Sequence, residues 1–219
     1  MKQLKGKALL MVWANVPIEM EDDYNRWYNE EHIEERLSCP GFLSAGRYEA
    51  VSSGPKHLAV YELDNIGALQ TKEYQHFKNF PSELSQHVLA GITIIRNSYE
   101  MIFPLDLSED VASSEMAPAL QIGRMEVSPQ EDAEWNEWYN SVYVPNYMKV
   151  PGCIRGRRYK GVSLTPGQPK YSTVYELTDP EISKTDEWLR QRAIDPRNTK
   201  WQNAMNHAPG SPGVWIRTY

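Results

Sequence analysis

The sequence predicts an α+β fold in which two copies of one βαββαβ unit pack their sheets face to face within a single chain. Three observations predict it: an internal repeat, the same order of strands and helices in both copies, and a first strand that is apolar along most of its length. The chain has 219 residues, of which 41% are hydrophobic. It is therefore long enough to bury a core as one domain, or as two domains of about 100 residues each.

The internal repeat is clearest in two short segments, "WYNEEH" at residues 27–32 and "WYNSVY" at residues 138–143. At the same offset of 111 positions, the matching pairs include Asn25 and Asn136, Pro40 and Pro151, Gly41 and Gly152, Arg47 and Arg158, and Tyr48 and Tyr159. After a three-residue insertion, "PKHLAVYEL" at 55–63 matches "PKYSTVYEL" at 169–177. So many matches in one order indicate an internal duplication.

Residues 104–118, "PLDLSEDVASSEMAP", separate the two copies. This segment is rich in proline, serine and acidic residues and has little to pack, so we predict that it is a linker. The predicted domains are accordingly a first repeat at 1–103 and a second, degenerate repeat at 119–219.

Each copy begins with a strand and a helix. Residues 8–15, "ALLMVWAN", are nearly continuously apolar, which is typical of a strand buried on both faces. A helix at 22–32 follows, with Asp22 or Asp23 as its N-cap. The second copy has Pro145 where the first has Glu34, so we expect this helix to kink or restart just after residue 32. The first copy then continues with a strand at 42–51, a strand at 57–63, a helix at about 66–79 and a strand at 91–102.

The order βαββαβ is the ferredoxin-like layout, in which one antiparallel four-stranded sheet carries two helices on a single face. The other face of such a sheet needs cover. Two sheets packed face to face supply that cover and close a barrel, and a tandem repeat provides both from one chain. We therefore expect an intrachain pseudo-dimer that acts as a monomer or pairs through its outer helices as a homodimer.

The segment "WYNEEHIEERLSCPGFLSAGRYEAV" followed by "KHLAVYEL" resembles the EthD-like branch of the dimeric α+β barrel superfamily. The resemblance covers most of the first copy and, more weakly, the second. It implies a pocket between the sheet and the first helix, usually without a metal or an organic cofactor. Relatives in this superfamily include cofactor-free oxygenases, dehydratases, cyclases, decarboxylases, lactone isomerases and haem enzymes, so the fold does not choose the reaction.

His32 is the main candidate for catalysis. On a continuous helix it would form a row with Tyr28 and Arg36, because each is four residues away. The helix C-terminus and the carboxylates of Glu31 and Glu35 favour the imidazolium, whereas burial opposes it, so His32 is expected to titrate near neutrality and to move protons. The alternative is a structural histidine that binds a free backbone carbonyl at the kink.

Arg47 is the candidate anchor for a substrate oxygen or carboxylate, and Tyr28 is the expected hydrogen-bonding neighbour of His32. Arg47 and Arg158 occupy equivalent strand positions, each next to a tyrosine that points to the opposite face. A buried arginine needs a carboxylate, either from Glu31 or Glu35 or from a substrate, so an internal ion pair repeated by duplication is an equally good interpretation. The candidate substrate-binding residues are Trp13, Tyr24, Trp27, Glu31, Arg36, Tyr48, Tyr143 and Arg158.

The replacement of His32 by Tyr143 in the second copy predicts that only the first copy keeps the chemistry. Tyr143 could instead be a working acid or hydrogen-bond donor, which would give two unlike sites. Because Val142 and Val144 flank it, a tyrosine of the core is the simpler interpretation.

Charge and motif content exclude several other functions. The net charge of −6, with one short basic run at 155–158, argues against a nucleic-acid partner. Cys39 and Cys153 are too few for a disulfide framework, and the other histidines lack metal-ligand spacing. Haem stays open because it needs only one axial histidine, for which His87 is the candidate. Without an apolar membrane span or a secretory signal at the start, the expected location is the cytoplasm.

These observations predict a cofactor-independent enzyme that acts on a small aromatic or polyketide-like molecule by proton transfer through His32. Its reaction class would be that of a lyase, dehydratase, decarboxylase or isomerase. Two alternatives stay open: a cofactor-free monooxygenase and a non-catalytic small-molecule binding protein. In each case we expect no cofactor and no metal.

Overall fold

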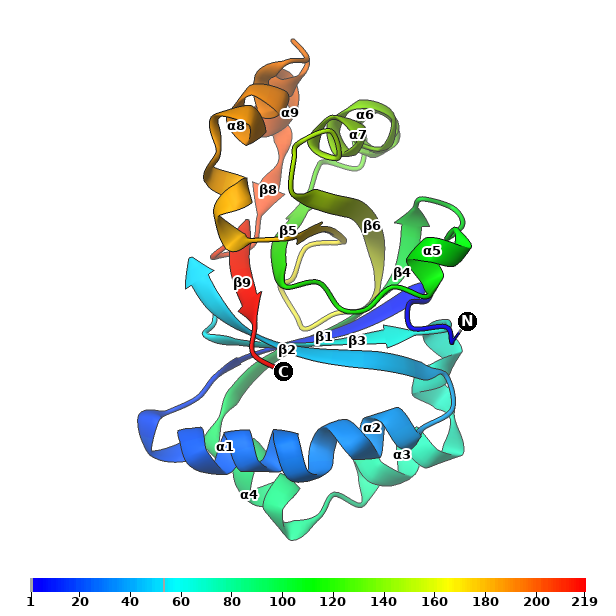
Figure 1. Cartoon of the computed structure of the whole chain (residues 1–219), viewed down its shortest axis with the longest axis vertical. Helices are drawn as coiled ribbons and strands as arrows, with labels where there is room; N and C mark the ends of the chain where they lie inside the picture. Colours follow the sequence, from blue (N-terminus) through cyan, green and yellow to red (C-terminus); the bar gives the residue numbers. More distant parts are fainter. Residues whose placement is uncertain (1, 53) are drawn as a thin grey trace.

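A closed antiparallel β-barrel of eight strands forms the centre of the computed structural model, which describes residues 2–52 and 54–219. One group of helices lies below the barrel and a second group lies above it, and both chain ends lie beside it (Figure 1). The predicted α+β class is thus confirmed. None of the helices in the described part of the chain is long and apolar enough to cross a membrane.

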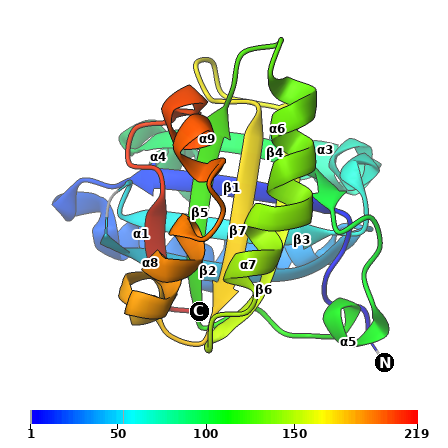
Figure 2. The same cartoon turned by 90° about the horizontal axis from the view of Figure 1, so that it is seen from above.

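The strands of the first half are β1 (Ala8–Asn15), β2 (Phe42–Ser52), β3 (His57–Leu63) and β4 (Thr93–Phe103). Those of the second half are β5 (Ala119–Glu126), β6 (Cys153–Ser163), β7 (Tyr171–Leu177) and β9 (Gly213–Arg217), with the short β8 (Asn206–His207) added beside β5. The strand order is β4-β1-β3-β2 in the first half and β9-β5-β7-β6 in the second. The barrel closes because β4 pairs with β6 and β2 pairs with β9. Seen from above, the strands of the two halves cross steeply (Figure 2).

The helices of the first half are α1 (Glu21–Trp27), α2 (Ile33–Ser38), α3 (Lys72–Asn79) and α4 (Glu83–Gly91). The second half has α6 (Asp132–Trp138), α7 (Val144–Tyr147), α8 (Asp186–Ala193) and α9 (Asn198–Ala204), and α5 (Glu109–Ala112) lies in the connection. The predicted helix at about 66–79 is a 3₁₀ turn, Ile66–Gln70, followed by α3. The sequence pattern does not predict α4, although Ser82 caps it by accepting a hydrogen bond from the amide of Ser85 at 3.0 Å.

One wide turn joins α1 to α2 and another joins α6 to α7. Residues Tyr28–His32 form a π-helical turn in which the amide of Ile33 donates to the carbonyl of Tyr28. Residues Tyr139–Tyr143 form the same turn, closed by the amide of Val144. The helix is expected to kink or restart just after His32, and the α-helical pattern does resume at Ile33, after a π turn that inserts one residue. In the second half Pro145, which has no N–H to donate, lies at the start of α7 directly after this turn.

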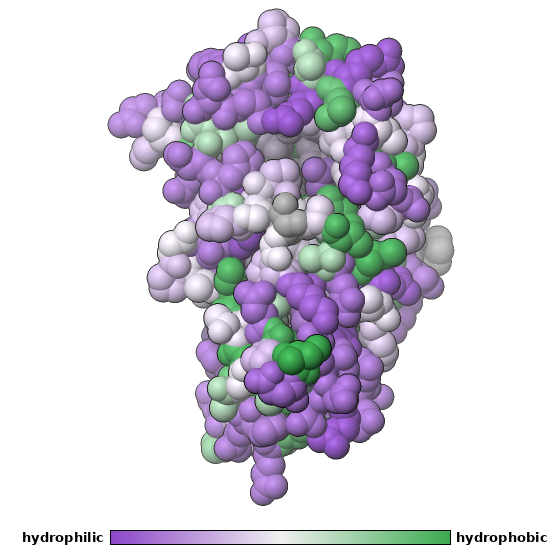
Figure 3. Space-filling model, turned by 90° about the vertical axis from the view of Figure 1, so that its left-hand side faces the viewer, coloured by the Kyte–Doolittle hydropathy of each residue, from purple (hydrophilic) through white to green (hydrophobic). Residues whose placement is uncertain are grey.

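The core has a barrel interior and two layers between the sheets and their helices. Along β1, Leu9, Met11 and Trp13 belong to the interior, whereas Leu10, Val12 and Ala14 face the helices, so both faces of this strand are covered as predicted. The outer surface is different. The face drawn in Figure 3 is mainly hydrophilic, with its apolar residues in small separate clusters.

The glutamates of the repeated "YEL" segments lie together inside the barrel. Arg157 bridges them, with its Nη1 donating to Glu62 at 3.0 Å and its Nη2 donating to Glu176 at 2.8 Å. Lys5 is 3.4 Å from each carboxylate, and Arg155 is 3.4 Å from Glu176. All five side chains are at least largely buried. This network of two carboxylates and three cations satisfies groups that would otherwise be costly to bury.

The connection between the halves packs more closely than its composition suggests. Met116 and Ala117 are buried in the barrel interior, where the carbonyl of Ala117 accepts a hydrogen bond from the hydroxyl of Tyr48 at 3.1 Å. The carbonyl of Ala112 accepts from the amides of Leu4 and Lys5 at 2.7 and 3.0 Å. The prediction that residues 104–118 have little to pack is therefore wrong for its last residues.

Candidate functional site

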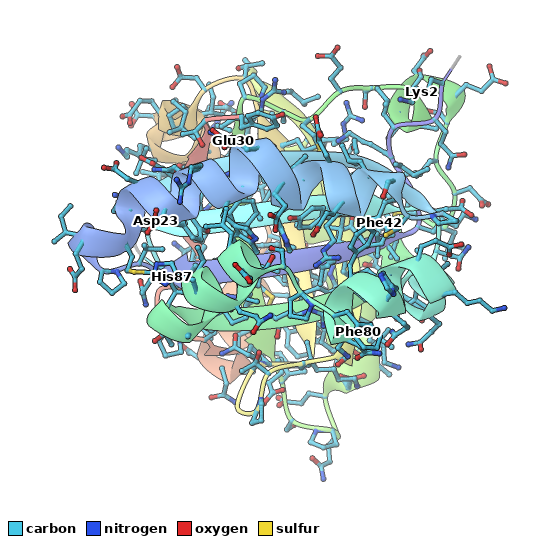
Figure 4. All side chains as sticks on the ribbon, turned by 90° about the horizontal axis from the view of Figure 1, so that it is seen from below. Lys2, Asp23, Glu30, Phe42, Phe80 and His87 are labelled. Atoms are coloured by element: carbon cyan, nitrogen blue, oxygen red, sulfur yellow. The ribbon has the colours of Figure 1, made fainter. Side chains whose placement is uncertain are left out.

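A cavity of about 190 Å³ lies between the sheet of the first half and its helices. We call it the first cavity. Its floor is the helix-facing side of β1, and its walls come from the helix of residues 21–38 and from α3 and α4. These helices run side by side across the sheet, with Phe80 just after α3 and Asp23 close to His87 (Figure 4). Aromatic side chains dominate the lining, and its members include Tyr24, Trp27, Tyr28, Tyr61, Tyr74 and Phe77.

His32 reaches this cavity from the end of the π turn. Its ring lies against the indole of Trp27, with ring centroids 4.0 Å apart, and edge-on to the phenol of Tyr28, at 5.2 Å. Its side chain is 12% exposed, and Nδ1 is buried without a hydrogen-bond partner. The wide turn thus brings imidazole and phenol together as predicted, although the helix around them is not a regular α-helix.

Burial lowers the pKa of His32 well below its usual value of 6.5, and the positive charge of Arg36 lowers it further. The expectation that His32 titrates near neutrality is wrong, because neither glutamate offsets these effects. Glu31 accepts hydrogen bonds from Ser82 at 2.5 Å and Ser85 at 2.8 Å instead. The Glu35 carboxylate is 3.9 Å from Nδ1, which is too long for a hydrogen bond. His32 is a neutral imidazole near pH 7, able to accept a proton.

Arg36 places a positive charge at the same cavity, without a carboxylate of the described residues in direct contact with it. Its side chain is 9% exposed, and its Nη1 is buried without a partner. The guanidinium lies near the rings of Tyr74 and Phe77, 5.3 and 5.8 Å from their centroids. Within residues 2–52 and 54–219 it forms no ion pair. A buried cation without a counterion is costly, so the site is suited to an anion or to a developing negative charge.

Two tyrosine hydroxyls complete the polar part of the first cavity. The hydroxyl of Tyr61 is buried beside the Tyr28 phenol, without a hydrogen bond of standard geometry, and burial raises its pKa well above 10. Burial also raises the pKa of Tyr28. Both groups therefore stay protonated at neutral pH, where they can donate hydrogen bonds but cannot act as bases.

Arg47, the predicted substrate anchor, lies outside the cavity. Its Nη1 donates to Oδ1 of Asn29 at 2.7 Å and its Nη2 donates to Oδ1 of Asn25 at 2.6 Å. Arg158 bonds Asn140 and Asn136 in the same way, at 2.6 and 2.9 Å. The expected carboxylate partners are thus replaced by amide oxygens. Both arginines join a helix to its sheet, which explains why the Arg and Asn positions recur together.

Trp13 and Tyr48 do not surround His32. They belong to the barrel interior, on the opposite face of the sheet from the first cavity. Tyr24 and Trp27, in contrast, line the cavity, and Trp27 Nε1 donates to Ser85 Oγ at 2.8 Å. The prediction of Trp13 failed because the sequence could not say which face of a doubly buried strand points toward the helix.

Several lining residues were missed, notably Tyr61, Tyr74 and Arg96. Tyr61 precedes Glu62 in the repeated "YEL" segment, and alternation along β3 places the two on opposite faces. Once Glu62 is assigned to the barrel interior, Tyr61 must face the helices. Arg96 Nη2 donates to the Tyr74 hydroxyl at 2.6 Å, so this pair closes one side of the cavity.

The second half contains a cavity of its own, of about 320 Å³, between its sheet and helices. We call it the second cavity. Tyr139, Tyr143 and Tyr147 line it where Tyr28, His32 and Arg36 line the first. The hydroxyl of Tyr143 accepts from Tyr147 and from Gln202, both at 3.1 Å. Tyr143 is thus largely buried, as expected for a core residue. It also lines the wall of the second cavity.

Haem does not fit either cavity. The predicted axial residue His87 lines neither of them, and its Nε2 is 3.1 Å from the Asp23 carboxylate. His32 faces about 190 Å³ and His207 lines the cavity of about 320 Å³. Sites for drug-sized ligands measure about 300–1,000 Å³, and haem is larger than most such ligands. Among the described residues there is also no group of three His, Cys, Asp or Glu side chains that could hold a metal ion.

Comparison with known proteins gives matches in structure alone. No family profile and no curated protein matches the sequence. An anthrone oxidase-like protein superposes with a TM-score of 0.64 at 14% identity, over 99% of this chain and 94% of that one.

A putative monooxygenase of Fusobacterium nucleatum superposes with a TM-score of 0.56 at 13% identity, over 98% and 94% of the two chains. A putative chlorite dismutase superposes with a TM-score of 0.60 at 13% identity, over 97% and 94%. These neighbours are dimeric α+β barrel proteins of ferredoxin-like layout. The comparisons therefore show that this chain has the dimeric α+β barrel fold.

Proposed function

We propose that the first cavity binds a small aromatic or polyketide-like molecule and that His32 removes a proton from it, without a cofactor. One observation carries this proposal: a buried imidazole with an unpaired Nδ1 and a buried guanidinium with an unpaired Nη1 line the same aromatic cavity. Burial and the charge of Arg36 lower the pKa of this imidazole, which keeps it neutral. A neutral imidazole can take a proton, and the fixed positive charge stabilises the anion that remains. The aromatic walls suit a flat ligand.

The chemical step follows from these positions. An imidazole nitrogen of His32 takes the proton from an acidic C–H or O–H group of the ligand. The bonding electrons stay on the ligand, which becomes a delocalised enolate or phenolate. Arg36 stabilises this anion, and the Tyr61 hydroxyl is free to donate a hydrogen bond to its oxygen. Return of the proton to a different carbon gives isomerisation, and loss of a leaving group gives the reaction of a lyase or dehydratase.

Oxygenation without a cofactor is the second candidate function. Its support is the likeness in fold to an anthrone oxidase-like protein and to a putative monooxygenase. An electron-rich carbanion made by His32 could react directly with dioxygen in place of a proton. The two functions share the deprotonation step and differ in the fate of the anion.

Deuterium exchange separates the proposal from simple binding. The probe is 2-tetralone, a two-ring ketone with acidic C–H groups, incubated with the protein in D2O without oxygen and followed by proton NMR. We expect the protein to accelerate loss of the C1 proton signals, and we expect 2-naphthoate, an anion of similar size, to inhibit. Saturable binding of both compounds without faster exchange would identify a carrier and reject the enzyme. Oxygen consumption with anthrone would favour the second candidate.

The chain is, we propose, a fused pair of EthD-like units at about 1–103 and 119–219. Support comes from features that recur at equivalent positions: the strand order, the π turn and the Arg–Asn hydrogen bonds. In this interpretation the strand pairs β4–β6 and β2–β9 are equivalent to the contacts that two separate chains would form across a dimer interface.

A further inference from the structure

The second cavity contains three buried polar atoms that make no hydrogen bond of standard geometry in the described part of the chain: the Tyr175 hydroxyl, the Thr173 hydroxyl and the Gln121 side-chain oxygen. The Tyr139 phenol lies near the two hydroxyls, and no group of the described residues is aligned with the Gln121 oxygen. Thr173 is 0% exposed and Tyr175 is 5% exposed. Each unsatisfied buried group costs about 1–3 kcal/mol, so such groups in one cavity indicate a missing polar partner.

The three groups form a compact set on two neighbouring strands. Gln121 of β5 pairs in register with Tyr175 of β7, and Gly123 pairs with Thr173. Residues two apart on a strand share a face, so all three side chains point toward the helices. Gly123 has no side chain, and the flexible end of Met125 lies over it at the edge of this polar floor.

The walls of the second cavity are aromatic. Tyr139, Tyr143 and Tyr147 descend from the helix of residues 132–147, and Trp188 of α8 lies with its ring centroid 4.3 Å from that of Tyr147. Burial raises the pKa of the Tyr175 phenol well above 10, so this hydroxyl stays a donor. Arg192, the one Arg or Lys of the lining, is exposed and donates to Gln202 at 2.9 Å. The buried part of the site therefore offers both hydrogen-bond donors and an acceptor, without a fixed charge.

We propose that the second cavity is a separate binding site for a neutral hydroxylated aromatic molecule of one or two rings. A ligand hydroxyl donates to the Gln121 oxygen, and ligand oxygens accept from Tyr175 and Thr173. The flat ring packs between the tyrosines and Trp188. This inference does not depend on the function proposed for the first cavity, because it uses other residues.

The test is isothermal titration calorimetry of the whole protein with 2,7-dihydroxynaphthalene at neutral pH. We expect saturable binding to the unaltered protein. Tyr175→Phe removes one hydrogen bond and should weaken binding by about three- to tenfold. Because that hydroxyl makes no hydrogen bond of standard geometry and only the Tyr139 phenol lies near it, the melting temperature of the unliganded variant should be nearly unchanged. Loss of a structural hydroxyl would lower it.

A second variant blocks the site. Val12 is the residue of the first half that is equivalent to Gly123, so Gly123→Val gives the second cavity the floor residue of the first. The added Cβ meets the flexible end of Met125. Binding should be lost. The matched control is His32→Gln, which should leave the affinity for this probe unchanged. Equal binding by the unaltered protein, Tyr175→Phe and Gly123→Val, or no binding at all, would overturn the proposal. Loss of binding in His32→Gln alone would place the probe in the first cavity and also overturn it.

Discussion

The two cavities lie at equivalent places in the fold and differ in their charged groups. In the first, His32 and Arg36 face the cavity, and its floor is Leu10, Val12 and Ala14. In the second, tyrosines replace both groups, and the floor is Gln121, Gly123 and Met125. The surrounding frame is shared, since both halves keep the π turn and the Arg–Asn hydrogen bonds.

This difference separates residues that build the fold from residues that give a site its chemistry. The features that both halves keep, the π turn and the Arg–Asn hydrogen bonds, hold a helix on a sheet. What differs lies at a cavity wall: a base and a cation in one half, neutral hydrogen-bonding groups in the other. In a duplicated chain, a residue that is the same in both halves, such as Arg47 and Arg158, is therefore weak support for function. A position at which the two halves differ, such as His32 and Tyr143, is stronger support.

The largest expected effect is the loss of proton transfer in the first cavity. His32→Gln should lower the rate of deuterium exchange into 2-tetralone by about 10²–10⁴, because general base catalysis contributes that much. Tyr143→Phe, the matched change in the second cavity, should alter the rate far less. Rates and thermal melts on both variants check this together. If Tyr143→Phe were the more damaging change, the reaction would belong to the second half.

The next prediction concerns what the two halves share. Arg47→Gln should lower the free energy of unfolding by about 2–4 kcal/mol, since it removes two charge-assisted hydrogen bonds to Asn25 and Asn29. Arg158→Gln should cost a similar amount. Urea unfolding measures both, and the exchange rate per folded molecule should stay near that of the unaltered protein. A large loss of rate in Arg47→Gln with little loss of stability would restore Arg47 as a catalytic residue.

A third prediction concerns the affinity of the first cavity for an anion, which depends on Arg36. Arg36→Gln should weaken the binding of 2-naphthoate by about 10- to 100-fold, because a hydrogen-bonded charge in a buried site typically contributes about 1.5–3 kcal/mol. Arg192→Gln removes a cation at the second cavity and should leave this affinity unchanged. Calorimetry with the two variants decides whether the buried guanidinium of the first cavity is an anion site.

Sequence patterns predicted much of the barrel because its strands carry strong signals. The apolar run of β1 predicted cover on both faces, and "YEL" marked matching strands in the two halves. Alternation also predicted that Arg47 and Tyr48 point to opposite faces, which they do. It could not identify Asn25 and Asn29 as the partners of Arg47, because that requires the position of the helix over the strand.

The candidate site was harder to predict for two physical reasons. A π turn adds one residue to a helix without a residue type that marks it, so its place between Tyr28 and His32 is set by packing. The pKa of His32 depends mainly on burial, which spacing along the chain does not encode. The spacing of four residues placed Arg36 beside His32, but it could not say that the two glutamates would fail to offset its charge. A site in the second half stayed an open alternative through Tyr143. Its polar floor was not predicted, because the exchange of Leu10 for Gln121 has meaning only once both are known to face the helices.

The smallest expected effect is a difference in pH dependence between the halves. Because the folded-state pKa of His32 lies below its unfolded value of about 6.5, the unfolded chain binds a proton there first as the pH falls. Its contribution is constant above pH 6.5, and below that stability should decline by at most about 1.4 kcal/mol per pH unit. His32→Gln should remove this part of the decline between pH 7.5 and 5.5 in thermal melts. Burial raises the pKa of Tyr143 above 10, so Tyr143→Phe should leave the slope of stability against pH unaltered in that range and change it only at alkaline pH. An equal acid decline in the unaltered protein and in His32→Gln would mean that this imidazole titrates alike in the folded and unfolded chains, and the neutral base of the proposed function would lose its physical basis.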